Sequence, residues 1–252
     1  MPVSATSRLA FPSLRRRFGR SEMLCAAAVL SAGLLSQVDW AEGTSKNDVS
    51  NSESPIPVAP AGEQLAQAID ELDVEHNWLR SRWPVAWKSG RSIRERRGVP
   101  VTPAVREGTH CSAFVAAVAG RLGVPLLRPP DHRQTLLSNA QFDWLLSDVA
   151  SAYGWLPVDS PVEAQSAANR GELVIATYRN PDPRQPGHIA VVRPFPKPPQ
   201  LVEQEGPQIV QAGFNNYRSA SLQAGFSYHR GAWVANGKRE VRFFRHAIAG
   251  RN

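Results

Sequence analysis

The spacing of hydrophobic residues predicts helices in the first half of the chain. Over residues 62–82, apolar side chains recur three, four and seven positions apart, at Leu65, Ile69, Leu72 and Leu79, which is the repeat of one helix face. Pro84 should end this helix because proline breaks the helical hydrogen-bond pattern. A second, mainly apolar helix is predicted over 111–122, where Gly123 and Pro125 mark its end.

Two more helices are predicted before the pattern changes. Residues 134–150 place apolar side chains on one side of a helix, at Leu136, Leu137, Phe142, Leu145, Leu146 and Val149. A short helix is expected over 162–169. Between the first two helices, residues 88–108 carry many arginines with glycine and proline, which is typical of a surface loop.

The second half of the chain reads as strands. Short runs rich in β-branched and aromatic residues, bounded by proline, glycine and asparagine, occur at 172–178, 188–192, 208–212 and 240–244. The proline-rich residues 194–207 should join two of these strands as a long hairpin loop. Helices followed by strands predict an α+β fold with an antiparallel sheet.

The N-terminal residues 1–41 resemble an export signal. A basic start precedes an apolar core at 23–35 that is too short to span a bilayer comfortably. The arginines at 15–17 are also compatible with the twin-arginine variant of such a signal, and an uncleaved anchor is the alternative. We therefore expect a bacterial protein that is periplasmic or secreted. Residues 42–61 read as a flexible linker, and residues 62–252 as the folded domain.

The net charge of the chain limits which binding partners are expected. The 252 residues carry a formal net charge of +7, and removal of residues 1–41 leaves about +4 by the same count. This mild basic bias suits association with anionic cell-envelope polymers. No zinc finger, glycine-rich phosphate loop or arginine helix accompanies it, so no nucleic acid is expected. We also expect no stable membrane insertion after removal of the signal.

The two cysteines have different expected fates. Cys25 lies inside the export signal, which leaves Cys111 as the thiol of the mature chain. Cys111 begins an apolar helix, with Thr109 as the expected cap. Free N–H groups at a helix start stabilise a thiolate, and they can also bind an oxyanion. We therefore expect a lowered pKa and a nucleophile; the alternative is a small buried hydrophobic residue.

A nucleophilic cysteine needs a base, which is usually a histidine. His188 follows Gly187 and opens an apolar strand, where a polar ring is costly to bury unless it is used or hydrogen-bonded. His110 is expected to be a cap or a supporting group. The remaining histidines, His76, His132, His229 and His246, are interpreted as surface or packing residues. A zinc site is not expected because no two histidines have ligand spacing.

A third polar group usually orients the base. An antiparallel pairing of 188–192 with 208–212 places Gln211 near the histidine, where its amide oxygen can fix the tautomer of the imidazole. Asn215 and Asn216 are alternatives on the next turn. Trp78 and Trp87, together with Asn215, are tentative substrate-binding residues, although tryptophans are also common core residues.

These segments resemble a known group of enzymes. The Thr-His-Cys-Ser-Ala-Phe-Val helix start, the Gly-His-Ile-Ala-Val-Val strand and the later Gln-Ile-Val-Gln-Ala-Gly are similar to NlpC-type and CHAP (cysteine, histidine-dependent amidohydrolase) cell-wall hydrolases of the papain-like superfamily. The resemblance implies a cysteine-bearing helix packed on an antiparallel sheet. It further implies that Cys111 is the nucleophile, His188 the base and Gln211 the third polar residue.

The expected activity is the hydrolysis of amide bonds, most simply in bacterial peptidoglycan, by an endopeptidase or an amidase without metal or organic cofactor. The loop at 194–207 is longer than in that group, and the tryptophan-rich residues 75–90 have no counterpart there, so the bond cleaved stays open. A non-catalytic envelope-binding domain and an acyltransferase with the same Cys-His pair are the alternatives. Oligomeric state, and the choice between housekeeping enzyme and secreted toxin, also stay open.

Overall fold

The computed structural model describes residues 54–81, 83–93, 108–234 and 237–250. The predicted export signal and most of the predicted linker lie outside these residues. The helices are α1 (Pro60–Asp70), α2 (Cys111–Arg121), α3 (Leu137–Leu145), α4 (Asp148–Ala152), α5 (Pro161–Asn169), α6 (Pro199–Glu205) and α7 (Leu222–Gly225). The strands are β1 (Leu156–Val158), β2 (Leu173–Tyr178), β3 (His188–Val192), β4 (Gln208–Gln211), β5 (Tyr217–Ser221) and β6 (Arg242–His246).

The six strands form one antiparallel sheet in the order β1-β6-β2-β3-β4-β5. The predicted α+β class is therefore confirmed. The predicted pairing of the histidine strand with the glutamine strand is also confirmed, since Val191 lies opposite Val210 and Val192 opposite Ile209. The sequence pattern did not predict the edge strands β1 and β5, because they are short and largely polar or exposed.

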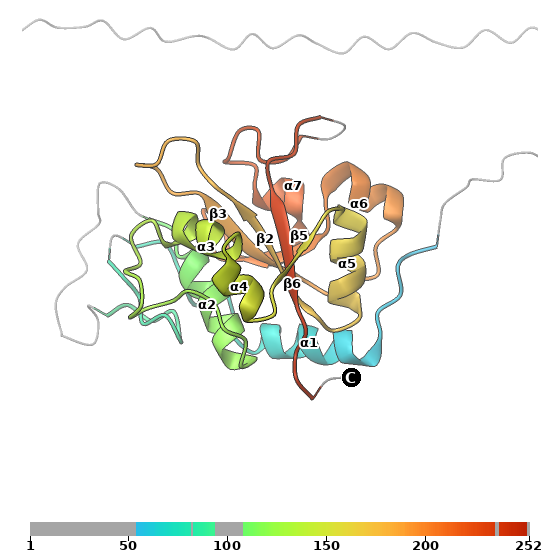
Figure 1. The fold of residues 1–252 in the computed structure, drawn as a ribbon, viewed down its shortest axis with the longest axis horizontal. Coiled ribbons are helices and arrows are strands. Elements are labelled where there is room, and N and C mark those ends of the chain that lie inside the picture. Colours follow the sequence, from blue (N-terminus) through green and yellow to red (C-terminus); the bar gives the residue numbers. More distant parts are fainter. Residues whose placement is uncertain (1–53, 82, 94–107, 235–236, 251–252) are drawn as a thin grey trace, which may run out of the picture. The chain divides into compact units, whose positions relative to one another are not determined.

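Helices cover both faces of the sheet (Figure 1), with α2, α3 and α4 on one side and α5 and α6 on the other. Successive residues of a strand point to opposite faces. In β3, Ile189 and Val191 join the core under α2, whereas Ala190 and Val192 join the core under α5. Burial on both faces explains why this strand reads as an unbroken apolar run.

The first helix differs from its prediction at both ends. It starts at Pro60, whose fixed φ suits the first helical position, and residues 54–59 precede it in extended form, with Ile56 N–H donating to Lys197 O. Residues 54–61, which fall within the predicted linker, therefore include the start of α1 and a backbone contact with residue 197. The helix ends at Asp70 and not near residue 82, because Asp73 adopts a positive φ of 51°, and Leu79 is exposed.

The predicted helix at 134–150 is two helices. Leu136 has a positive φ of 56° directly before α3, and Ser147 caps α4 by accepting a hydrogen bond from the Ala150 N–H. The expected apolar face is wrong in part, since Leu146 and Val149 are exposed. Polar side chains of α3 are buried instead, namely Ser138, Asn139 and Gln141. Their hydrogen bonds are described with the site below.

The remaining predictions hold with small shifts. The helix at 162–169 is α5, and the strand expected at 240–244 is β6, two residues later. The proline-rich connection at 194–207 is not only loop, because α6 begins at Pro199 within it.

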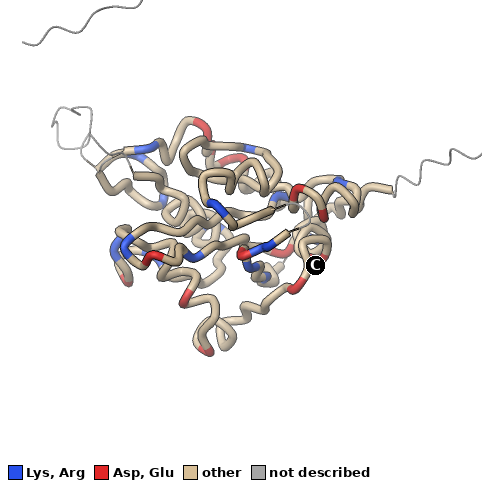
Figure 2. The backbone as a smooth tube through the Cα atoms, turned by 90° about the horizontal axis from the view of Figure 1, so that it is seen from above, with Lys and Arg blue, Asp and Glu red and all other residues tan. Residues whose placement is uncertain are grey.

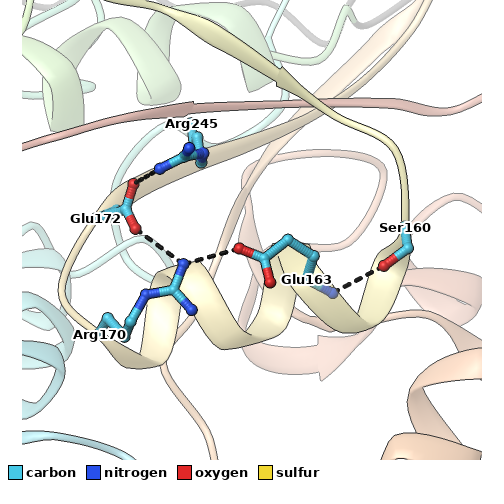
Figure 3. A network of polar contacts seen from close by, with 5 residues as sticks. All are labelled: Ser160, Glu163, Arg170, Glu172 and Arg245. Carbon is cyan, nitrogen blue, oxygen red and sulfur yellow. Dashed lines mark hydrogen bonds and ion pairs between the residues drawn. The ribbon is translucent and has the colours of Figure 1, made fainter.

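A polar network fastens α5 to the sheet (Figure 3). Arg170 donates to Glu163 at 2.8 Å and to Glu172 at 3.1 Å, and Arg245 of β6 donates to Glu172 at 2.7 Å. The Ser160 hydroxyl accepts the Glu163 N–H and so caps the helix. These charges are partly exposed, and exposed ion pairs add little to the free energy of folding. The main role of the network is to fix the position of α5 against the sheet.

Basic and acidic residues both occur around the described part of the chain (Figure 2). Among the described residues, no helix is long and apolar enough to cross a membrane.

Candidate functional site

Cys111 is the first residue of α2, and its thiol is nearly closed off from solvent, with 4% of the residue exposed. Backbone N–H groups of Ile189, Ser112 and Cys111 itself point at the sulfur, and the Thr109 hydroxyl lies 3.9 Å from it. The N-cap of the helix is His110, and no side chain caps it. Thr109 is therefore not the cap that the sequence suggested; its hydroxyl faces the sulfur instead.

The expected lowering of the Cys111 pKa is wrong for this structure. Burial raises the pKa of the thiol, and this effect exceeds the opposing effect of the surrounding N–H groups and the Thr109 hydroxyl. A thiolate that leaves water loses more solvation free energy than these hydrogen bonds return. The resting form of Cys111 is the neutral thiol.

His188 opens β3 and is 3% exposed. Its Nε2 lies 2.8 Å from Gln211 Oε1, so the predicted proximity of these two residues is confirmed. The other end of the same amide donates from Nε2 to Asn215 O at 3.1 Å. Since this fixes which amide atom faces the ring, His188 must donate its Nε2 proton to Gln211, which leaves Nδ1 as a free base.

Burial lowers the pKa of His188 to about 4, and the hydrogen bond to Gln211 opposes this shift. The imidazole is therefore neutral at neutral pH. A neutral ring with one nitrogen bonded and the other available can accept a proton, which is the property that a general base requires.

The helix and the strand bring the thiol and the imidazole to adjacent positions without joining them. The sulfur takes a hydrogen bond from the N–H of Ile189, the residue after His188. Among the described residues, the hydrogen bonds of the two side chains go elsewhere: the His188 ring bonds to Gln211, and the Thr109 hydroxyl faces the Cys111 sulfur.

The turn before His188 leaves no room for a side chain. A Cβ on Gly187 would lie 2.1 Å from Tyr178 O and 2.6 Å from Asn139 Oδ1. The amide of Gln211 also lies against a position that has no room for a side chain. A Cβ on Gly225 would lie 2.5 Å from Gln211 Oε1. These two glycines permit the close approach that orients the base and its partner.

Buried polar side chains of α3 hold the same turn. Asn139 Oδ1 accepts the Gly187 N–H at 2.8 Å, and its Nδ2 donates to Gln185 O at 2.9 Å. Ser138 donates to Gly187 O at 3.2 Å, and Gln141 donates to Ser112 O at 3.2 Å. Since α3 contacts both the His188 turn and the start of α2, it fixes the two sides of the site relative to each other.

Aromatic residues surround His188 on its other side. The His229 ring stacks on the His188 ring at 5.1 Å between centroids, and Phe226 meets it edge-on at 4.6 Å. Burial and the neighbouring His188 lower the pKa of His229 to about 4. We had interpreted His229 as a surface or packing residue; its position against the candidate base depends on the fold after α7 and has no local signal.

Two exposed rings flank, in the sequence, residues that approach His188. Phe214 is 44% exposed and Tyr228 is 60% exposed, and their centroids are 4.6 Å apart. Phe214 follows Gly213, where a Cβ would lie 3.4 Å from His188 Cε1, and Tyr228 precedes His229. We missed both rings, although the position of Phe214 directly after Gln211-Ala212-Gly213 was a usable signal.

The tentative substrate-binding residues are not brought together. Trp78 is 1% exposed and packs edge-on against Phe114 at 5.2 Å, so it is a core residue and no substrate reaches it. Trp87 lies against Gly120, near the other end of α2. Asn215 is exposed, and its side chain donates to the Tyr217 hydroxyl at 3.1 Å. Of the three residues, only Asn215 lies near the Cys111–His188 pair, because its backbone oxygen accepts a hydrogen bond from Gln211.

The other polar candidates have structural partners. The His110 ring is buried, lies 3.2 Å from the Ser81 hydroxyl, and has a pKa lowered to about 4 by burial. Asn216 donates to Val74 O and Asn77 O, at 2.6 and 2.8 Å. Among the described residues, no group of three or more His, Cys, Asp or Glu side chains could hold a metal ion.

Comparison with known proteins gives no family for this chain: no protein-family model matches it, and no curated protein matches it significantly.

Proposed function

We propose that this chain is an exported cysteine hydrolase of the papain-like type that cleaves amide bonds in bacterial peptidoglycan. The observation that carries the proposal is the oriented imidazole: His188 Nε2 is held by Gln211 at 2.8 Å, with Nδ1 free, next to a thiol that begins a helix. A cysteine with only a packing role does not require an imidazole whose tautomer is fixed nearby.

The reaction begins with rotation of the Cys111 side chain toward His188. The thiol proton passes to His188 Nδ1 as the sulfur forms a bond to the substrate carbonyl carbon, and the backbone N–H of Cys111 helps to hold the oxyanion. The carbon–nitrogen bond then breaks, and the imidazolium gives its proton to the leaving amine. The product of this half-reaction is a thioester on Cys111.

Water completes the cycle through the same groups. His188 takes a proton from water while the oxygen bonds to the thioester carbon, the carbon–sulfur bond breaks, and the proton returns to the sulfur. Both the thiol and the imidazole start this route uncharged, because burial disfavours the charged form of each. Phe214 and Tyr228 offer the substrate an exposed aromatic surface beside the reacting groups.

One observation favours a second candidate, a non-catalytic envelope-binding domain of the same fold. The Cys111 sulfur is buried and bonded to the Ile189 N–H instead of the imidazole. In such a domain the thiol is only a small core residue.

Mass spectrometry of muropeptides separates the two candidates. Purified wild-type protein and Cys111→Ala are incubated with isolated sacculi, and we expect new amide-cleavage products with the wild type alone. Products in both reactions, or in neither, contradict the hydrolase proposal. Alkylation by iodoacetamide, mapped to peptides so that Cys111 is distinguished from Cys25, shows in the same samples whether the thiol becomes accessible.

A further inference from the structure

A cavity of about 740 Å³ lies against the C-terminal end of α2. Apolar side chains of Leu72, Trp87 and Ala117 contribute to its walls, and Lys88, Arg121 and Arg128 also line it. Gly120, at this end, lies nine positions after Cys111 in the helix, which is roughly 14 Å along the axis. The cavity is therefore distinct from the Cys111–His188 site.

Two of the three cations have no acidic partner among the described residues. Arg121 pairs with Glu71, whereas neither Lys88 nor Arg128 has an ion pair with any residue of the described chain. Both lie over the Trp87 ring instead, with Lys88 Nζ at 5.6 Å and Arg128 Cζ at 5.3 Å from its centroid. The cavity therefore presents beside an indole two positive charges that no described acidic residue pairs with.

The positions of the ring and the guanidinium are set by the helix. A Cβ at Gly120 would lie 3.2 Å from the Trp87 ring and 3.4 Å from Arg128 Nη1. The absence of a side chain at Gly120 lets both groups pack against the α2 backbone. Such fixed donors lose less conformational entropy on binding than free surface side chains do.

We propose that this cavity binds a sugar that carries a carboxylate. The volume falls in the range of small-molecule sites and exceeds what a simple ion fills. The guanidinium of Arg128 and the ammonium of Lys88 supply charged hydrogen bonds to the carboxylate. The C–H face of a sugar ring packs on the apolar walls that Leu72 and Ala117 form, which a bare inorganic anion cannot use.

This inference goes beyond the proposed hydrolase and does not require it. If both hold, the cavity retains an anionic glycan at one end of α2 while an amide bond is cleaved at the other. Binding is therefore measured separately from hydrolysis.

Calorimetric titration of the full chain tests the proposal with three probes: trigalacturonic acid, the neutral sugar chitotriose, and inorganic phosphate. We expect trigalacturonic acid to bind and chitotriose and phosphate to bind at least 10-fold more weakly. Arg128→Gln should weaken the binding of trigalacturonic acid about 10-fold, since the loss of a charged hydrogen bond lowers affinity by about that factor. Lys88→Gln, at an exposed position, should weaken it less, and Arg128→Lys should recover part of the loss.

Arg242→Gln is the matched control, because it removes the same charge from an exposed residue that does not line the cavity. Its affinity should equal that of the wild type. Three results overturn the proposal. Equal losses of affinity in Arg242→Gln and Arg128→Gln would show a nonspecific charge effect, and phosphate that binds as tightly as trigalacturonic acid would show a simple anion site. No binding of trigalacturonic acid would exclude the site. Unchanged peptide hydrolysis in Arg128→Gln keeps this outcome separate from the proposed function.

Discussion

The two ends of α2 treat polar groups in opposite ways. At the N-terminal end, Cys111 and His188 are buried, and burial shifts the pKa of each toward its neutral form. At the C-terminal end, Lys88 and Arg128 line a cavity and keep charges without an acidic partner in the described chain. Desolvation therefore favours the uncharged forms of Cys111 and His188 and opposes charge separation between them, whereas partial exposure allows Lys88 and Arg128 to keep their charge.

The largest effect should follow from removing the base. We expect His188→Gln to lower kcat for amide hydrolysis about 10³-fold, because general-base catalysis contributes 10²–10⁴-fold. Arg128→Gln, at the other end of the helix, should leave the hydrolysis of a soluble peptide unchanged. Steady-state kinetics with purified protein measures both. Equal activity in His188→Gln and the wild type would show that His188 is not the base, and the two ends of α2 would then not differ in their role in catalysis.

Acidification should lower the free energy of unfolding through His188, which lies at the N-terminal end of α2. The pKa of His188 is about 4 in the folded protein and about 6.5 in an unfolded chain, so the unfolded state binds the proton first as the pH falls. The free energy of unfolding is therefore fully retained above about pH 6.5 and declines toward pH 4. His188 alone should account for a loss on the order of 3 kcal/mol.

Urea unfolding at several pH values checks this dependence. His188→Gln should flatten the decline between pH 6.5 and pH 4, whereas Arg128→Gln should not. His76→Gln is the control histidine, because His76 is exposed and Asp73 raises its pKa. An equally steep decline in His188→Gln would contradict the buried, neutral state of this ring.

Adding one carbon at the turn before His188 should cost stability. In Gly187→Ala the new Cβ meets Tyr178 O at 2.1 Å, and we expect a loss of about 1–3 kcal/mol, as for overpacking elsewhere. Gly108→Ala is the matched control, since its Cβ would meet only Ser81 O at an ordinary 3.6 Å. Thermal unfolding compares the two variants; similar melting temperatures would mean that the turn is not tightly constrained.

The smallest effect is expected at Gln211. Gln211→Ala removes the acceptor that fixes the His188 tautomer, and we expect kcat to fall about 10-fold, as for the loss of one hydrogen bond. Gln211→Glu keeps an acceptor and adds a negative charge, which favours the imidazolium and should raise the pKa of His188. The rate–pH profile of Gln211→Glu should shift upward accordingly. An unshifted profile with normal kcat in both variants would exclude an orienting role.

Local patterns predicted the elements that carry the site. The apolar run after Cys111 is α2, and the β-branched run after His188 is β3. The antiparallel pairing of β3 with β4 brings the end of β4 near the start of β3, which is where Gln211 meets His188. Long helices were less well predicted, since the ends of α1 and α3 depend on single left-handed residues, Asp73 and Leu136.

Hydrophobic spacing and residue order predicted the α+β class, the cysteine at a helix start and the histidine at a strand start. Three features follow only from the folded chain: burial keeps the thiol and the imidazole neutral, Asn139 holds the His188 turn, and His229 stacks on the candidate base. The physical reason is that periodicity reports contacts between near neighbours in the chain. Desolvation and polar contacts depend instead on which distant segments close over a group.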